Sequence, residues 1–345
     1  KQFRFKSSSL RFRIFSMGAC STKQMAAEEK GELEGLSATG ELMARVVKVG
    51  KPSQCDPTGT GMIVNDILTP WNFKTTDPFI LLHEFGPVDQ ATMNIPIGMH
   101  PHRGFNEVPY LKQGCWVGTD AWKPRGDPAK PMRSGSLQWG FIGSGIEHGV
   151  NFDRSYKGPV HGFQLWVNLP AAQKMDPPCF QDAEPEALPV VSLSDTAQAK
   201  VLVGELDGQA SPINPGSLRV QYIDFMLKAG ADITHTLPAG YTAVFAYVYS
   251  GRGHICSRPA AKGDVLQVEA LGPLKFTASD GELGLVLLAG VPLQEKIVQH
   301  GPFVMASRDQ IQTAFQDYQT GRFLNETCNY VLHKPTGSVE SQVKL

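Results

Sequence analysis

The sequence has no excess of charge of either sign. Its 32 Lys and Arg residues almost balance 33 Asp and Glu residues, leaving a formal net charge of −1 over 345 residues. Domains that bind nucleic acid usually carry a basic patch or a strongly basic pI, so direct nucleic-acid binding is not expected. Long hydrophobic runs are also missing. The longest, Leu283 to Leu293, is far shorter than the roughly 20 residues of a membrane helix, so we predict no membrane span.

Cysteine is scarce and scattered. The six cysteines include no CxxC pair, which in a chain of this length is typical of reduced thiols in an intracellular protein. Glycine and proline, by contrast, are plentiful at 35 and 25 residues, above the usual shares of about 7% and 5%. They are spread along the chain, which predicts many turns between short strands and not a disordered tract.

Residues 1–43 are predicted to form an extension outside the folded part. Residues 1–27 hold six Lys or Arg residues, several serines and no acidic residue, a composition typical of organelle-targeting segments. If the chain instead starts at Met17, it begins Met-Gly-Ala-Cys-Ser-Thr, which fits myristoylation of Gly18. Palmitate on Cys20 would then strengthen a peripheral membrane anchor. Targeting, lipidation and a disordered tail all stay open.

From about residue 44, two stretches have similar patterns. Residues 107–118 and 241–256 each combine a β-prone run, a glycine and a second β-prone run, around Gly114 and Gly251 respectively. Each is followed by a glycine–polar step and another strand-like run. This weak repeat of about 130 residues is too long for a solenoid and fits two similar β-barrels.

The sequence therefore predicts an all-β fold of two tandem barrels packed together, with one short C-terminal helix. The expected segments are an N-terminal barrel at 44–175, a linker at 176–190, a C-terminal barrel at 191–325 and a tail at 326–345. The helix is expected at 308–319, because Ser307 and Gln310 form a capping box and Gly321 can end the helix. Its apolar face should pack against a barrel.

The residues with the strongest chemical signal lie between Gly98 and Gly114. His100 and His102 are two residues apart on a predicted strand, so both side chains point to one face and can bind one ion. A glycine-rich strand ending in His148 can return antiparallel beside the first strand and supply a third imidazole. Imidazoles with a nearby carboxylate suit one divalent transition metal, and iron, nickel, copper, manganese and zinc all stay open.

These motifs resemble the two-part cupin signature: His-x-His, four residues, Glu, six residues, Gly, and then a downstream Gly-x-x-His. Other segments resemble pirin sequences in order across about 44–325, namely 77–85, 100–105, 137–139, 161–169 and 298–305. The pirin resemblance implies two cupin barrels with a metal, usually iron, in the N-terminal barrel only. The second barrel agrees, since around 229–245 it has only His235 and no His-x-His pair. The resemblance also implies a cytoplasmic or nuclear location.

The fourth metal ligand departs from the resemblance. Pirins take it from a glutamate two residues after the third histidine, where this chain has Val150, which cannot ligate. Glu107 stands instead where germin-like cupins carry a metal-binding glutamate. Strand alternation would point Glu107 away from the histidines, but a bulge or bend at 103–104 would turn it inward. We predict Glu107 as the fourth ligand, with water or Glu147 as alternatives. A scaffold whose metal site has decayed also stays open.

Two functions follow from the resemblance. In the first, the protein opens the ring of a quercetin-like flavonol, a small aromatic enol, with oxygen. The metal then acts as Lewis acid and template, and Glu107 as ligand or general base. In the second, it is a non-catalytic iron- or redox-sensing interaction protein or transcription cofactor, whose metal shifts a surface that binds a protein partner. His83 replaces an acidic residue common in that family segment, and the sequence does not explain the change.

Overall fold

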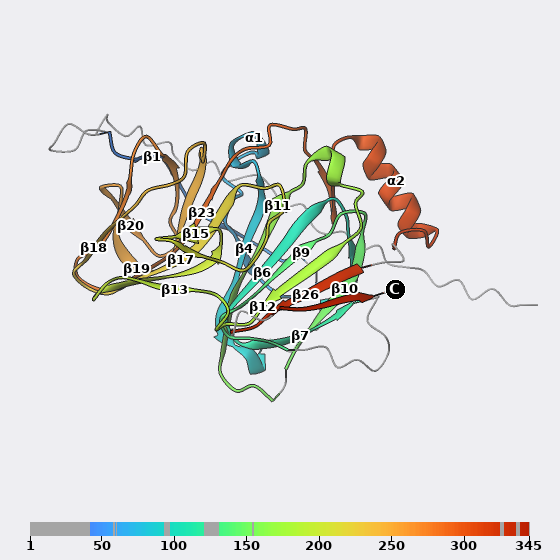
Figure 1. The fold of residues 1–345 in the computed structure, drawn as a ribbon, viewed down its shortest axis with the longest axis horizontal. Helices are drawn as coiled ribbons and strands as arrows, with labels where there is room; N and C mark the ends of the chain where they lie inside the picture. Colours follow the sequence, from blue (N-terminus) through green and yellow to red (C-terminus); the bar gives the residue numbers. More distant parts are fainter. Residues whose placement is uncertain are drawn as a thin grey trace, which may run out of the picture.

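The computed structural model describes residues 42–57, 59, 61–92, 97–120, 131–153, 155–324, 328–335 and 339–344. Almost all of the regular structure is β-strand, arranged as two barrels side by side with a short helix near the C-terminus (Figure 1). The predicted all-β, two-barrel fold is therefore confirmed. The expected targeting or lipidation segment, including Gly18, lies outside the described residues. In the described ranges no helix is long and apolar enough to cross a membrane.

The first barrel consists of two sheets. The larger has nine strands in the order β2 (Ser53–Cys55), β3 (Val64–Asp66), β4 (Phe79–Asp89), β11 (Pro159–Asn168), β6 (Phe105–Gln113), β9 (Ser136–Phe141), β12 (Cys179–Ala183), β26 (Cys328–His333) and β27 (Val339–Lys344). The smaller has four, in the order β5 (Ile97–His102), β10 (Ile146–Phe152), β7 (Cys115–Asp120) and β8 (Met132–Arg133). Neighbours are antiparallel except β12 and β26, which run parallel.

The second barrel is built on a ten-stranded sheet. Its main path runs through β1 (Arg45–Gly50), β21 (Val265–Glu269), β19 (Ala243–Ile255), β23 (Leu283–Gly290), β17 (Val220–Leu227), β14 (Ala197–Val203) and β13 (Val190–Ser194). Attached to this path are β18 (Ala231–His235), β20 (Arg258–Ala261) and β22 (Leu274–Ala278).

Short elements complete the description. Two small hairpins are formed by β15 (Glu205–Leu206) with β16 (Gln209–Ala210), and by β24 (Val298–His300) with β25 (Phe303–Met305). The helices are α1 (Phe73–Thr76) and α2 (Arg308–Gln319), with single 3-10 turns at Gln90–Thr92 and Ala171–Gln173.

The predicted helix is confirmed as α2. The Ser307 side chain accepts a hydrogen bond from the backbone N–H of Gln310, while the Gln310 side chain accepts from Ala306 N–H, one residue earlier than a standard capping box. Ile311 and Ala314 are buried against Phe303 and neighbouring apolar side chains. The helix therefore packs through its apolar face, as the sequence predicts.

The two glycine-centred stretches behave differently. Gly114, at φ +123°, separates β6 from β7, and the two strands then join different sheets of the first barrel. Around Gly251 the expected strand–turn–strand is wrong, because residues 243–255 form one continuous strand, β19, with a bulge between Val248 and Ser250. A Cβ atom at Gly251 would lie 1.7 Å from the carbonyl oxygen of Glu282. Glycine lets β19 bend closely against its neighbour without reversing direction.

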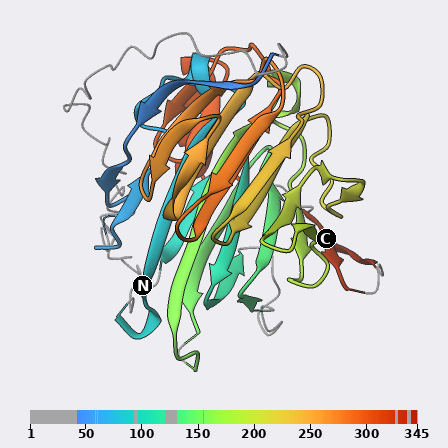
Figure 2. The same ribbon diagram turned by 90° about the vertical axis from the view of Figure 1, so that its left-hand side faces the viewer.

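Segments from both ends of the described chain join the barrel that is more distant in sequence. The early strand β1 pairs with β21 of the second barrel, where Figure 2 shows it in blue beside the orange strands. Residues 326–345, expected as a tail, instead contribute β26 and β27 to the first barrel, next to β12. Strand β12 itself lies inside residues 176–190, which were expected to form a linker. Strands β1 and β26 cover the edges that β21 and β12 would otherwise expose.

The barrels contact each other through a mixed apolar and polar core. One buried cluster includes Phe163 of the first barrel and Tyr222 of the second. Within it, the fully buried carboxylate of Asp224 accepts hydrogen bonds from Tyr110 Oη at 2.8 Å, Tyr249 Oη at 2.7 Å and Lys112 Nζ at 2.6 Å. These donors offset the cost of burying a charge and hold the two barrels in register.

Candidate metal centre

The three predicted histidines converge. Strand β10 pairs antiparallel with β5, which places His148 directly opposite His100, with His102 two residues further along β5 on the same face. The ring centroids of His100 and His102 are 4.7 Å apart, those of His100 and His148 4.6 Å, and those of His102 and His148 5.0 Å. One nitrogen from each ring lies within 4.8 Å of the others, so the three could hold a metal ion.

The ring nitrogens are oriented for this purpose. Nδ1 of His100 lies 2.7 Å from the carbonyl oxygen of Gly98, so it donates to that oxygen and leaves Nε2 as an acceptor. Nε2 of His102 is buried and makes no hydrogen bond. A buried nitrogen without a hydrogen bond is costly in a folded protein, whereas a bound metal would supply its partner. Backbone support on the far side of the His100 ring is typical of metal-binding histidines.

Burial also sets the protonation of these rings. The pKa of His102 lies well below its ordinary value because burial disfavours the charged ring, and the neighbouring His100 and His148 lower it further. Burial likewise lowers the pKa of His100, partly opposed by the hydrogen bond to Gly98. Neutral imidazole is the form that binds a metal, so both rings are ready to ligate at neutral pH.

Glu107 points toward the histidines. Its carboxylate oxygens lie 3.3 Å from Nε2 of His148 and 3.6 Å from Nε2 of His102, although Glu107 belongs to β6 in the opposite sheet. The expected bend is present: β5 ends at His102, and Gly104 has φ +91°. The side-chain amide of Gln164 on β11 donates to Glu107 and orients the carboxylate. Its role as a metal ligand stays a prediction.

The two other sequence positions considered for the fourth ligand are those of Val150 and Glu147. Val150 lines the same cavity as His148, so the position that the pirin resemblance assigns to the fourth ligand presents an apolar group. Glu147 accepts a hydrogen bond of 3.2 Å from Tyr318 on α2. Its carboxylate is therefore engaged by the helix, outside the group formed by the three histidines and Glu107.

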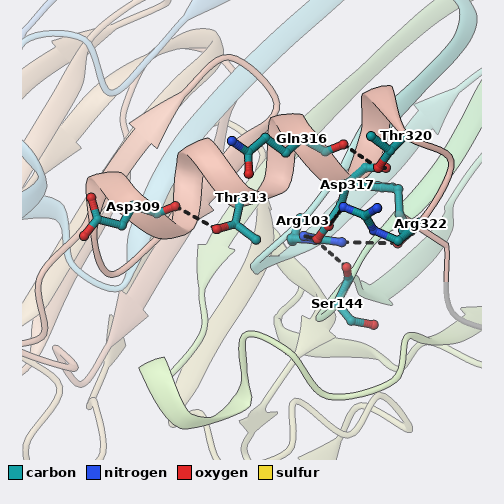
Figure 3. A network of polar contacts seen from close by, with 9 residues as sticks. Arg103, Ser144, Asp309, Thr313, Gln316, Asp317, Thr320 and Arg322 are labelled. Atoms are coloured by element: carbon teal, nitrogen blue, oxygen red, sulfur yellow. Dashed lines mark hydrogen bonds and ion pairs between the residues drawn. The ribbon is translucent and has the colours of Figure 1, made fainter.

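Two supporting residues were not foreseen from the sequence. The first, Arg103, follows His102 directly and is almost fully buried. Its guanidinium donates to the carbonyl oxygen of Ser144 at 2.5 Å and to Asp317 on α2 at 2.8 Å (Figure 3). It also donates to the carbonyl oxygen of Phe323 at 3.3 Å. These contacts tie the end of β5 and the start of β10 to one helix. An arginine after a His-x-His pair carries no local signal of such distant partners.

The second is Lys174, whose fully buried ammonium lies behind the glycine bend. Its Nζ donates to the carbonyl oxygen of Gly104 at 2.7 Å, the side chain of Asn168 at 2.6 Å and the carbonyl oxygen of Val304 at 3.2 Å. Burial lowers the pKa of Lys174 to about 8. The ammonium therefore holds the bend that separates the histidine strand from the glutamate strand.

The site opens into a cavity of about 650 Å³ inside the first barrel. Its wall combines the histidines with aromatic side chains such as Trp116, Phe85 and Trp166. Such a mixture of apolar walls and a few convergent polar groups, at this volume, is typical of a small-molecule site.

Two mainly antiparallel β-barrels in one chain, with a three-histidine group in the first, define a bicupin with a candidate metal centre. Comparison with known proteins identifies the family to which the chain belongs. Residues 63–167 match the family described as Pirin, and residues 222–324 match the Pirin C-terminal cupin domain. The chain belongs to the pirin family.

Individual relatives agree with this assignment. The chain is 34% identical over 270 residues to a Pseudomonas aeruginosa protein named "Putative quercetin 2,3-dioxygenase", covering 76% of this chain and 92% of that protein. It is 34% identical over 278 residues to human pirin, covering 76% and 89%. A solved structure of quercetin 2,3-dioxygenase from Acinetobacter baumannii shares the fold, with a TM-score of 0.72 and 24% identity over 81% of this chain and 98% of that one.

Proposed function

We propose that this bicupin binds one iron ion at His100, His102 and His148 and opens the ring of a quercetin-like flavonol with oxygen. The observation that carries the proposal is the convergence of the three imidazoles and the Glu107 carboxylate at one cavity. The name of the Pseudomonas aeruginosa relative supports the choice of reaction. When bound, the metal would supply a Lewis acid and a template for the substrate's oxygen atoms.

The side chains of the cavity suit a planar, polyphenolic substrate. Phe85 stacks on Trp116 at 5.4 Å between ring centroids, and Trp166 stacks on Phe105 at 4.1 Å. These paired rings form stiff apolar surfaces on which an aromatic substrate can stack. Val150 adds a further apolar wall beside the histidines.

Glu107 has the position for proton transfer. A flavonol binds a metal most strongly after its enol hydroxyl loses a proton, so the reaction needs a base within hydrogen-bond reach. The Glu107 carboxylate faces the ring nitrogens of His102 and His148, and Gln164 fixes its orientation. We propose that Glu107 takes this proton, as a metal ligand or beside the metal.

Oxygen consumption with quercetin tests the proposal. The iron-loaded protein should consume oxygen when quercetin is added, and His102→Ala should abolish both iron content and uptake. The matched control is His235→Asn in the second barrel, which changes a buried histidine that does not line the cavity and should keep both. Iron retention without any uptake across candidate flavonols would overturn the dioxygenase proposal.

One observation favours a second function, that of an iron- or redox-sensing interaction protein. Arg103 joins the residue after His102 to Asp317 on α2, so a change at the metal could shift a helix near the molecular surface. Metal retention without turnover, together with a different protease-cleavage pattern of α2 in the ferrous and ferric forms, would favour this alternative.

A further inference from the structure

A second group of potential metal ligands lies on another wall of the same cavity. It consists of Cys55, Asp66 and His83, on the neighbouring strands β2, β3 and β4 of the larger sheet, whereas the three histidines belong to the smaller sheet. One ligand atom from each residue lies within 4.8 Å of the others. The site proposed above does not use any of the three.

Strand register places these side chains together. Asp66 on β3 pairs directly with His83 on β4. Cys55 on β2 pairs with Val64, two residues before Asp66. Because side chains two residues apart on a strand share a face, the thiol, the carboxylate and the imidazole all point into the barrel.

The histidine and the carboxylate lack ordinary partners. Nε2 of His83 lies 3.7 Å from Oδ2 of Asp66, too long for a hydrogen bond, and the His83 side chain is only 10% exposed. In the part of the chain that the structure describes, neither the His83 ring nor the Asp66 carboxylate makes a side-chain hydrogen bond. Both side chains face the cavity, so a ligand bound there can complete the hydrogen-bonding and charge requirements of this pair.

The spacing fits a tetrahedral metal ion. Zinc binds sulfur at about 2.3 Å and nitrogen or oxygen at about 2.0–2.2 Å, which separates two tetrahedral ligand atoms by roughly 3–4 Å. The 3.7 Å between His83 and Asp66 falls in that range. A thiolate beside an imidazole selects zinc-like ions over the harder cations that prefer oxygen ligands.

We propose that Cys55, Asp66 and His83 form a second metal site, which binds Zn²⁺ with its fourth position open to the cavity. Binding displaces the thiol proton of Cys55, so affinity rises with pH. The proposal does not depend on whether the three-histidine centre is catalytic.

Cobalt titration of the full-length, metal-free protein tests the site, because only a Co²⁺–thiolate bond gives intense near-ultraviolet charge-transfer absorption. The wild type should bind two equivalents of Co²⁺ and show this band, and Zn²⁺ should remove the band. His102→Ala should keep the band and lose one equivalent. Cys55→Ser should abolish the band and weaken Zn²⁺ binding at the second site by at least about tenfold.

Cys179→Ser is the matched control, since Cys179 lies on β12 and does not line the cavity; its band should be unchanged. Absence of the band in the wild type, or its persistence in Cys55→Ser, would overturn the proposal. If circular dichroism shows that Cys55→Ser is unfolded, the nearly isosteric Asp66→Asn decides. It should weaken Zn²⁺ binding about tenfold with the His102-dependent equivalent intact, and unchanged Zn²⁺ affinity would refute the site.

Discussion

The Glu107 carboxylate lies 3.3 Å from Nε2 of His148, although the two residues belong to strands in different sheets of the first barrel. The contact exists because the chain bends at Gly104 between the histidine strand and the glutamate strand. It brings a carboxylate to the imidazoles of the candidate metal centre.

Removing ligands should lower metal content in a defined order. His102→Ala removes a fully buried imidazole and should leave the first site without iron. Glu107→Ala should weaken iron binding by about 10–100-fold, because the remaining three imidazoles supply no negative charge. Elemental analysis of the purified variants after identical iron loading measures this. Iron affinity equal to wild type in Glu107→Ala would mean that water, not Glu107, is the fourth ligand.

The glycine bend should be intolerant of any side chain. A Cβ atom at Gly104 would lie 2.0 Å from the carbonyl oxygen of Val304, and the residue has φ +91°. Gly104→Ala should therefore cost at least about 1–3 kcal/mol of unfolding free energy and weaken iron binding. Gly98→Ala is the control, since Gly98 has no atom within 4 Å of its added Cβ. Urea unfolding measures the free energy of unfolding of both variants. Equal values for Gly104→Ala and Gly98→Ala would contradict the prediction.

The Arg103–Asp317 ion pair should contribute to stability. Arg103 is almost fully buried, so Asp317→Asn, which leaves the guanidinium without its charged partner, should cost about 2–4 kcal/mol. Arg322 also approaches Asp317, at 3.9 Å, but its side chain is 69% exposed. Arg322→Met should accordingly cost less than about 1 kcal/mol. Chemical unfolding of the two variants measures both losses of stability. A larger loss in Arg322→Met than in Asp317→Asn would contradict the prediction.

His235 should make the protein acid-sensitive independently of metal. Burial lowers its pKa to about 4, below the ordinary value of about 6.5, so between these values the unfolded chain binds more protons than the folded one. Its contribution to stability is complete above pH 6.5 and is lost as the pH falls toward 4, by about 3 kcal/mol in total. Nε2 of His235 forms a hydrogen bond with the side chain of Gln221. The variant His235→Gln can keep this hydrogen bond without the titrating ring.

The measurement is the unfolding free energy of wild type and His235→Gln between pH 4 and 7, with metal removed. The variant should lose less stability on acidification, so the two curves should converge at low pH. Parallel curves would show that His235 is protonated equally in the folded and unfolded states.

Local patterns were sufficient for much of the fold and part of the site. His100 and His102 could be placed on one face because side chains on a strand alternate, and α2 could be placed because Ser307, Gln310 and Gly321 mark its ends. The glycine-rich strand that ends in His148 indicated a third imidazole, the internal repeat indicated two barrels, and the resemblance to pirins implied that only the first barrel holds a metal. These features depend on residues close together in sequence or on a motif with fixed spacing.

Other features depend on contacts between distant segments, which no local pattern records. Only the packed structure shows that Lys174, 70 residues away in sequence, holds the bend at Gly104. The same is true of the contact that ties Arg103 to Asp317 on α2. The same holds for β1, which joins the second barrel, and for β26, which joins the first. The sequence by itself determined which side chains could carry metal chemistry. The tertiary structure decided which of them meet, because strand pairing and burial bring together residues that the chain keeps apart.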